Sequence, residues 1–136
     1  MEKLLAANWP NLIGEDKLFW SSEWVKHGTC AEQELSKVEY FQLALHIHYK
    51  TNLRQILAKE KIVPDEKHLY NVTSVVAAIR EHTQHDPELD CFVDTAKNHT
   101  ALFQVSVCLS RDGSSYVSCP DTRGSCLQPQ LLFPKD

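Results

Sequence analysis

Helical spacing of hydrophobic residues dominates the first 85 residues of the chain. The clearest helix opens with a capping box, in which Ser36 is followed three residues later by Glu39. The side of this helix expected to face inward carries Val38, Phe41, Ala44, Leu45 and His48. A second helical run follows, with an inward side made of Leu53, Ile56 and Leu57.

Shorter helices are expected on either side of these two. Near the start, residues 4–12 contain Pro10, which should end any helix there. Residues 18–27 suit a short helix, and Gly28 is a natural stop for it. Further along, either Thr73 or Ser74 is expected to cap a helix whose buried side includes Val72, Val76 and Ile79.

Beyond Pro87 the pattern changes to the alternation that is typical of strands. Residues 102–109 are expected to form a half-buried strand whose inner face carries Phe103, Val105, Val107 and Leu109. Asp112-Gly113 is a hairpin turn signal, after which residues 115–119 return as a second strand. Helices followed by antiparallel strands predict the α+β class, and the length of 136 residues predicts a single domain over residues 1–136.

The five cysteines are many for a reducing compartment and indicate a disulfide framework. Cys108 and Cys119 are about equally far from the hairpin turn, so they should face each other or nearly so. Cys91 with Cys126 is then the simplest second bridge, and Cys30 remains as a free thiol.

Other features of the sequence bear on its compartment. The sequons at Asn71 and Asn98 are candidate glycosylation sites of a secreted protein, although such triplets also arise by chance. Against export, the apolar run within residues 1–8 is too short for a signal peptide. No segment approaches transmembrane length, so no membrane partner is expected. The conflict between the cysteines and the start suggests that a preceding segment is missing.

Residues 19–30 read FWSSEWVKHGTC and gather an acid, a cation and an imidazole. An imidazole can accept a proton near neutral pH, which makes His27 a candidate base. Glu23 lies one turn earlier and can orient that ring, while Lys26 offers an ammonium group to a phosphate oxygen. The set suits phosphoryl transfer or hydrolysis. For the bare spacing E-x-x-K-H, however, a helix with one ion pair and a surface histidine is the better reading.

The full string closely resembles the second active-site segment of the ribonuclease T2 family, F-W-x-H-E-W-x-K-H-G-T-C. Segments elsewhere also resemble this family, above all its plant S-like and S-ribonucleases: Trp9-Pro10-Asn11, Tyr40-Phe41, Thr51-Asn52-Leu53, Cys91-Phe92-Val93-Asp94, Ser118-Cys119-Pro120 and Leu132-Phe133-Pro134. The resemblance covers essentially the whole chain but only the C-terminal portion of a complete family domain. It implies helices packed on an antiparallel sheet whose N-terminal part is missing.

The resemblance also implies an activity. Family members are endoribonucleases that cleave single-stranded RNA without metal or cofactor, through a 2′,3′-cyclic phosphate, and spare DNA because it lacks the 2′-hydroxyl. Carried over to this chain, His27 would be the general base, and Glu23 and Lys26 would stabilise the transition state. Phe19 would stack on a base, and Asn11 would contact that base's edge. For Phe19, core packing is an equally good reading, and it is the better one for both neighbouring tryptophans, Trp20 and Trp24.

The chain departs from the family pattern in two ways. Ser22 stands where the family usually has a histidine that helps to hold the phosphate, so weaker substrate binding is expected. The family's first active-site segment, H-G-L-W-P, which carries the general acid, is not in the sequence. The disulfide pattern of the family agrees with Cys91–Cys126 and Cys108–Cys119, and it implies that the partner of Cys30 lies upstream of Met1. We therefore expect impaired or no activity from this chain alone.

Two other interpretations remain. The chain could be a non-catalytic relative that binds RNA or a protein partner. A zinc protein built from His27, Cys30 and the later cysteines is a weaker alternative, because these residues lack the paired close spacing of structural zinc sites. The remaining histidines are expected on the surface or satisfied in the core: His46, His48, His68, His82, His85 and His99. By resemblance, the full-length protein is expected to be a secreted or vacuolar monomer.

Overall fold

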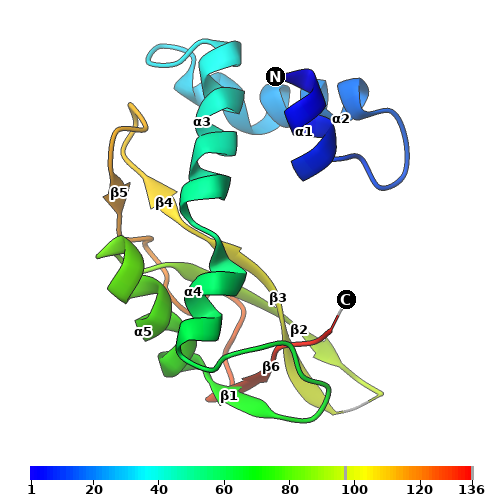
Figure 1. The fold of residues 1–136 in the computed structure, drawn as a ribbon, viewed down its shortest axis with the longest axis vertical. Helices are drawn as coiled ribbons and strands as arrows, with labels where there is room; N and C mark the ends of the chain where they lie inside the picture. The colour runs from blue at the N-terminus through cyan, green and yellow to red at the C-terminus, as the bar shows by residue number, and fades with distance from the viewer. Residues whose placement is uncertain (97, 136) are drawn as a thin grey trace. The chain divides into compact units, whose positions relative to one another are not determined.

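The computed structural model describes residues 1–96 and 98–135. The chain divides into two compact units, Met1–Thr51 with Arg111–Gly113 and Asn52–Ser110 with Ser114–Asp136 (Figure 1). The first unit is helical, whereas the second carries two helices and both sheets. The α+β class expected from the sequence is therefore confirmed.

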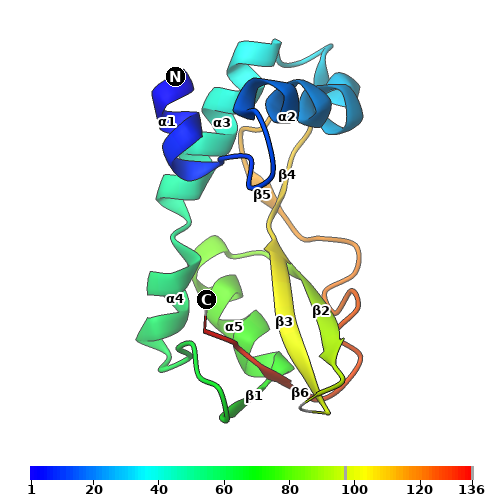
Figure 2. The same ribbon diagram turned by 90° about the vertical axis from the view of Figure 1, so that its right-hand side faces the viewer.

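The first unit is built from α1 (Glu2–Asn8), α2 (Asp16–Glu23), a π-helical turn η1 (Trp24–Gly28), a 3₁₀ turn η2 (Thr29–Ala31) and α3 (Lys37–Lys50) (Figure 2). Helix α3 begins at the expected capping box. The Ser36 hydroxyl accepts from the backbone N–H of Glu39 at 3.3 Å, and the Glu39 carboxylate accepts from the backbone N–H of Ser36 at 2.8 Å. The side chains of Asn8 and Tyr49 tie α1 to α3 through a hydrogen bond of 2.8 Å.

Aromatic side chains dominate the core of the first unit. Its buried residues are Leu5, Trp20, Trp24, Phe41 and Leu45. The inward side of α3 is narrower than expected, because Val38 is 51% exposed and His48 also lies on the surface. Phe41 and Leu45, in the middle of the helix, are its buried residues.

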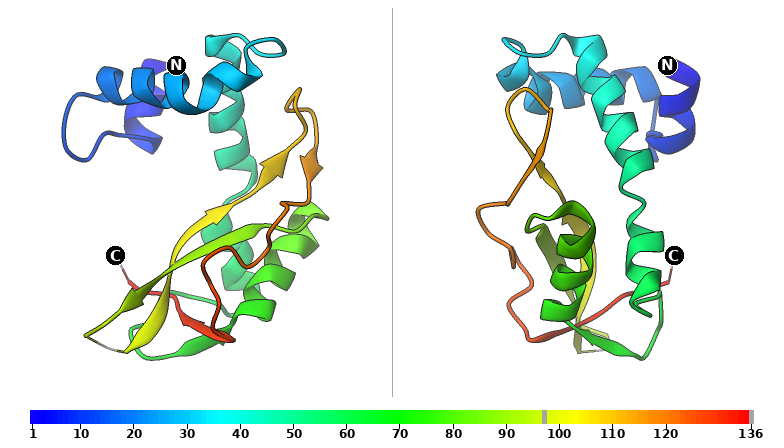
Figure 3. Two further views of the ribbon diagram at one scale, coloured as in Figure 1. Left: turned by 180° about the vertical axis from the view of Figure 1, so that it is seen from behind. Right: turned by 60° about the vertical axis from the view of Figure 1, so that its left-hand side comes forward.

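The second unit contains α4 (Leu53–Lys59), β1 (Leu69–Asn71), α5 (Val72–Thr83), β2 (Glu88–Asp94), β3 (His99–Ser106), β4 (Cys108–Leu109), β5 (Tyr116–Val117) and β6 (Gln130–Leu132) (Figure 3). Four strands form one sheet in the order β1-β6-β3-β2, and β4 and β5 form a small antiparallel ribbon. Most pairs in the larger sheet are antiparallel, but β3 and β6 run parallel where Ala101 meets Leu132. Hydrophobic alternation carries no information about strand direction, so the sequence pattern could not indicate this pair.

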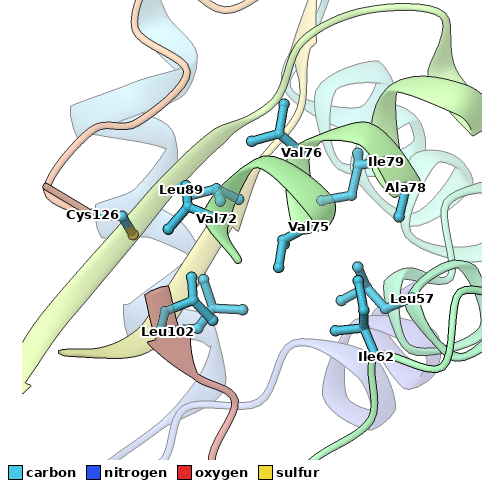
Figure 4. Packing of buried hydrophobic residues seen from close by; sticks show 11 residues of the cluster. Leu57, Ile62, Val72, Val75, Val76, Ala78, Ile79, Leu89, Leu102 and Cys126 are labelled. Carbon is cyan, nitrogen blue, oxygen red and sulfur yellow. The ribbon is translucent and has the colours of Figure 1, made fainter. Parts of the chain in front are cut away.

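Helix α5 and the larger sheet share one hydrophobic core (Figure 4). The buried residues of this core are Leu57, Ile62, Val72, Val75, Val76, Ala78, Ile79, Leu89, Leu102, Cys126 and Leu131. Full burial of each valine, leucine or isoleucine contributes about 1.5–3 kcal/mol. This cluster therefore supplies most of the hydrophobic stabilisation of the second unit.

The start of α5 differs from the expectation. The helix begins at Val72 and not after a cap at Thr73 or Ser74, and Asn71 in the capping position makes no side-chain capping bond. The helix starts early because of contacts with a distant part of the chain. The backbone N–H of Val72 donates to the carbonyl of Pro129 at 3.0 Å, and the Val72 side chain is buried in the core. Strand β1 therefore passes directly into the helix.

The expected strand over residues 102–109 is divided, and the face predicted for one residue was wrong. Phe103 was expected inside but is 72% exposed, while Leu102 is 8% exposed. The register of the β2–β3 pair shifts here, because Asp90 pairs with Gln104 whereas Cys91 pairs with Leu102. Phe103 is thus the extra residue of a β-bulge, which leaves it outside the alternation. A simple period of two cannot reveal such a bulge.

Two disulfides cross-link the second unit, and they are the pairs expected from the sequence. Cys91 and Cys126 are joined across 35 positions, and Cys108 and Cys119 across 11 positions. In the β4–β5 ribbon Cys108 lies opposite Val117, two residues from its disulfide partner. Within the described ranges, no helix is long and apolar enough to cross a membrane.

Candidate active site

The stretch FWSSEWVKHGTC forms the end of α2 and the two turns that follow it. Helix α2 ends at Glu23, and the chain then widens into the π-helical turn that carries Lys26 and His27. Single π-helical turns are rare and are found frequently at functional sites. The change of pitch means that simple three-and-four helical spacing does not describe how Glu23, Lys26 and His27 lie relative to one another.

Packing of Trp24 explains why the turn forms at this place. Its indole is buried and meets the ring of Tyr40 edge to face, with 5.5 Å between the ring centroids. The indole also lies against Gly28, where a Cβ atom would come within 2.2 Å of the indole carbon Cε3. The turn η1 ends at Gly28, where a stop was expected, but φ there is −93° and the chain continues directly into η2. This glycine is needed for close packing and not for a left-handed helix end.

The three polar side chains of the turn are available to a ligand. Lys26 and His27 are exposed, and Glu23 is half-buried. No ion pair or hydrogen bond to another described residue involves any of these three side chains. The reading of the segment as a helix held by one ion pair is therefore not supported in the part of the chain that the structure describes. Lys26 and His27 therefore lie on a turn that contains the buried Trp24, and Glu23 directly precedes it.

Tyr40 is a neighbour of this group that the spacing of the motif did not indicate. Its partial burial raises the pKa of the Tyr40 hydroxyl, and the charges of Glu23 and Cys30 raise it further. The hydroxyl therefore remains protonated at neutral pH, beside the Glu23 carboxylate. Only tertiary packing of α3 against η1 brings this ring to the site, so no local sequence signal could have found it.

The residues expected to hold substrate differ in what they pack against, although Phe19 and Ser22 are both half-buried. Phe19 is half-buried and packs edge to face on Trp9, with 6.0 Å between the ring centroids. Ser22 is half-buried on α2, in the turn of helix before the site. The two tryptophans are core residues, as expected: both are buried, and the Trp20 indole N–H donates to the Trp9 carbonyl at 2.8 Å.

Asn11 is engaged in its own loop. Its side-chain amide donates to the Glu15 carbonyl at 3.2 Å, and its side-chain oxygen accepts from the backbone N–H of Ile13 at 3.0 Å. Its backbone N–H donates to the Asp16 carboxylate at 2.7 Å. In this structure Asn11 therefore shapes the loop before α2, and one side-chain N–H and one acceptor site of its amide remain available to a ligand.

Cys30 is a free, exposed cysteine at the end of the motif. Its thiol lies 3.3 Å from the backbone carbonyl of His27, which it reaches as a weak donor. The neighbouring Thr29 hydroxyl donates to the Val25 carbonyl at 3.1 Å. Both side chains therefore support the turn from its C-terminal side.

The histidines outside the motif lie on the surface or are half-buried. His46, His48, His68 and His82 are exposed, and His85 and His99 are half-buried. Among the described residues, no group of three or more histidine, cysteine, aspartate or glutamate side chains could hold a metal ion.

Comparisons with known proteins point to the same family as the segment FWSSEWVKHGTC. Residues 1–119 match the ribonuclease T2 family. Ribonuclease 1 of Arabidopsis thaliana is 40% identical over 116 residues, which are 83% of this chain and 50% of that protein. The chain spans about half the length of the curated relatives that it matches.

Solved structures give the same result for the fold. Ribonuclease MC1 from the seeds of bitter gourd superposes with a TM-score of 0.87 at 28% identity, covering 97% of this chain and 68% of that one. RNase NT in complex with 5′-AMP superposes with a TM-score of 0.83 at 33% identity, covering 97% and 66% of the two chains. The sequence match over residues 1–119 and these superpositions lead to one conclusion: the chain belongs to the ribonuclease T2 family.

Proposed function

We propose that this chain carries the base-bearing half of a metal-independent endoribonuclease site for single-stranded RNA. The observation that carries the proposal is the π-helical turn, which presents Lys26 and His27 to solvent next to Glu23. The turn is held by the buried ring of Trp24, so the backbone that carries the three side chains is rigid. Phosphoryl transfer at a phosphodiester needs a cation and a base that are already held in position.

In the proposed reaction, His27 takes the proton of the ribose 2′-hydroxyl as that oxygen attacks the adjacent phosphorus. A bond forms between the 2′-oxygen and phosphorus, and the bond from phosphorus to the 5′-oxygen breaks. The products are a 2′,3′-cyclic phosphate and a 5′-hydroxyl, whose oxygen must gain a proton. Lys26 and Glu23 stabilise the charge that develops on the phosphoryl oxygens and on the imidazole. DNA cannot react in this way because it lacks the 2′-hydroxyl.

Substrate binding would use residues beside the turn. Phe19 is half-buried, so part of its ring is open to stack on a base. Ser22 can donate a hydrogen bond to phosphate but brings no charge, which predicts weak binding. Asn11 would contact a base edge with the N–H and the acceptor site that its loop bonds leave available.

The proton for the leaving 5′-oxygen is the part of the reaction that these residues do not provide. A well-placed general acid contributes about 10²–10⁴ in rate. We therefore propose that residues 1–136 by themselves cleave RNA poorly. A substrate whose leaving group needs no proton should avoid that defect.

This difference gives a direct test. Uridine 3′-(4-nitrophenyl) phosphate releases nitrophenolate, which leaves without protonation, whereas uridylyl-adenosine needs an acid. We expect measurable turnover of the nitrophenyl ester and little turnover of the dinucleotide. His27→Ala should lower turnover of the ester by about 10²–10⁴, the usual contribution of a general base. Addition of EDTA should change nothing.

His46→Ala is the matched control, because His46 is an exposed histidine on α3 outside the motif. It should leave turnover of the ester unchanged. Equal loss in both variants, or robust cleavage of the dinucleotide by the unmodified chain, would contradict the proposed division of roles.

A second candidate function is non-catalytic binding of RNA or a protein, favoured by serine at position 22 in place of the family's usual histidine. It predicts binding of a fluorescent single-stranded oligonucleotide with no turnover of either substrate. The two disulfides support a secretory or vacuolar location for either function, since such bonds persist in oxidising compartments. We expect a monomer in both cases.

A further inference from the structure

The second unit contains a cleft that has no part in the proposed ribonuclease site. Its volume is about 410 Å³, within the range of small-molecule pockets. It lies between the end of the β2–β3 pair and the segment that leads into β6, and its apolar lining is Leu69, Val93 and Pro129. Val93 is 66% exposed, so a large part of this apolar surface meets solvent.

The polar lining of the cleft is mostly neutral. Asn98 and Thr100 line one part of it and Gln128 another, and the Gln128 amide makes no hydrogen bond to another described residue. Among the lining residues that the structure describes, His99 is the one titratable side chain, and none is a carboxylate, lysine or arginine. Such a surface does not suit phosphate or a metal ion. It also offers no phenylalanine, tyrosine or tryptophan on which a base could stack. Hydrogen-bonding amides beside aliphatic side chains suit a neutral sugar.

The cleft includes an attachment point for a sugar. Asn98-His99-Thr100 is a sequon, and both Asn98 and Thr100 are lining residues. Asn98 is exposed and has φ of 52°, which places it in a turn between β2 and β3. The disulfides of the same unit indicate an oxidising compartment, and N-linked glycosylation takes place in the secretory pathway.

We propose that Asn98 carries an N-linked glycan whose first N-acetylglucosamine is seated in this cleft. In the attachment step the side-chain nitrogen of Asn98 bonds to C1 of the sugar and loses a proton. The bond from C1 to a phosphate oxygen breaks, and the diphosphate of the lipid-linked donor leaves. The acetamido group is then positioned for a hydrogen bond with Gln128, and the apolar face of the sugar covers Val93.

The other sequon provides an internal contrast. The Asn71 side-chain oxygen accepts at 3.3 Å from the amide of Gln130, which is a lining residue, but Asn71 itself is exposed and does not line the cleft. A glycan on Asn71 would therefore be attached outside the cleft. The two positions should differ in the accessibility of the bond between protein and sugar, even if both are modified.

The experiment uses the full chain secreted from a glycosylating yeast. Native protein is treated with peptide:N-glycosidase, and release at each sequon is followed by peptide mass. We expect Asn98 to be occupied and its glycan to be released about tenfold more slowly than after denaturation, the factor that corresponds to about 1.4 kcal/mol of docking free energy. A glycan on Asn71 should be released at similar rates in both states.

Two variants test whether the glycan on Asn98 is released slowly because it is seated in the cleft or because the folded chain protects it in general. Gln128→Ala should speed native release at Asn98, while Gln55→Ala, at an exposed glutamine of α4, should not. An unoccupied Asn98, or native release as fast as denatured release, would overturn the proposal. Tight binding of free N-acetylglucosamine to the Asn98→Gln chain would also overturn it, because the cleft would then serve a free sugar. None of these readouts depends on ribonuclease activity.

Discussion

The indole of Trp24 occupies the space that a side chain at residue 28 would need. A Cβ on Gly28 would lie 2.2 Å from Cε3 and 2.8 Å from Cζ3 of that ring. Because Trp24 is buried and also packs against Tyr40, its ring has little room to withdraw. The two residues together set the width of the turn that presents His27.

Gly28→Ala should therefore destabilise the first unit and displace the turn. Overpacking of this kind costs about 1–3 kcal/mol, measurable as a lower urea midpoint. Turnover of the nitrophenyl ester should fall as well. Gly14→Ala is the control, because its Cβ would meet only the side-chain nitrogen of Asn11 at 3.3 Å. Equal destabilisation by both substitutions would show that Gly28 has no special role.

Ser22→His should strengthen binding of a phosphate-bearing substrate. A protonated imidazole gives a charge-assisted hydrogen bond where serine gives a neutral one, a difference of about 1 kcal/mol or about fivefold in KM. The gain should be largest at about pH 5–6, below the ordinary histidine pKa of about 6.5, where the imidazole is mostly protonated. Ser21→His, at the exposed neighbouring position, should have no such effect. An unchanged KM for Ser22→His at pH 5 would contradict the placement of the phosphate beside residue 22.

Loss of the Cys91–Cys126 disulfide should be more destabilising than loss of Cys108–Cys119. The first closes a loop of 35 residues and the second a loop of 11. The entropy of the unfolded chain then predicts about 4 kcal/mol for the first and about 3 kcal/mol for the second. Cys126 is also completely buried, so its replacement leaves a cavity. Urea denaturation of the two double alanine variants checks the order, and the reverse order would refute it.

The capping box of α3 should make stability depend on pH in the acid range. The Ser36 hydroxyl, and then its backbone N–H, bond to Glu39 and hold the pKa of that carboxyl below its ordinary value of 4.5. Since the folded pKa is the lower one, the contribution of Glu39 is complete above pH 4.5 and is lost as the pH falls through the folded pKa. Urea midpoints from pH 7 to pH 3 should decline less steeply in Glu39→Gln than in the unmodified chain. Glu34→Gln, at an exposed carboxyl outside any cap, should leave the slope unchanged.

The sequence by itself determined those features that depend on neighbouring residues. The capping box at Ser36 and Glu39 and the inward residues Ile56 and Leu57 were predicted because helix signals act over three or four positions. The hairpin after Leu109 followed from its turn residues, and with it the disulfide pairs. The motif from Phe19 to Cys30 was sufficient to indicate the family and the three candidate catalytic side chains.

Tertiary structure decided what depends on contacts between distant segments. The bulge at Phe103 arises from pairing with β2, and the early start of α5 depends on a bond from Val72 to Pro129. The parallel pairing of β3 with β6 is likewise invisible in either strand alone. At the site, α3 brings Tyr40 to Trp24, and their packing together with Gly28 produces a π-helical turn where an ordinary helix was expected. Local spacing predicts which residues can act, but the packing of one buried ring fixes how they are presented.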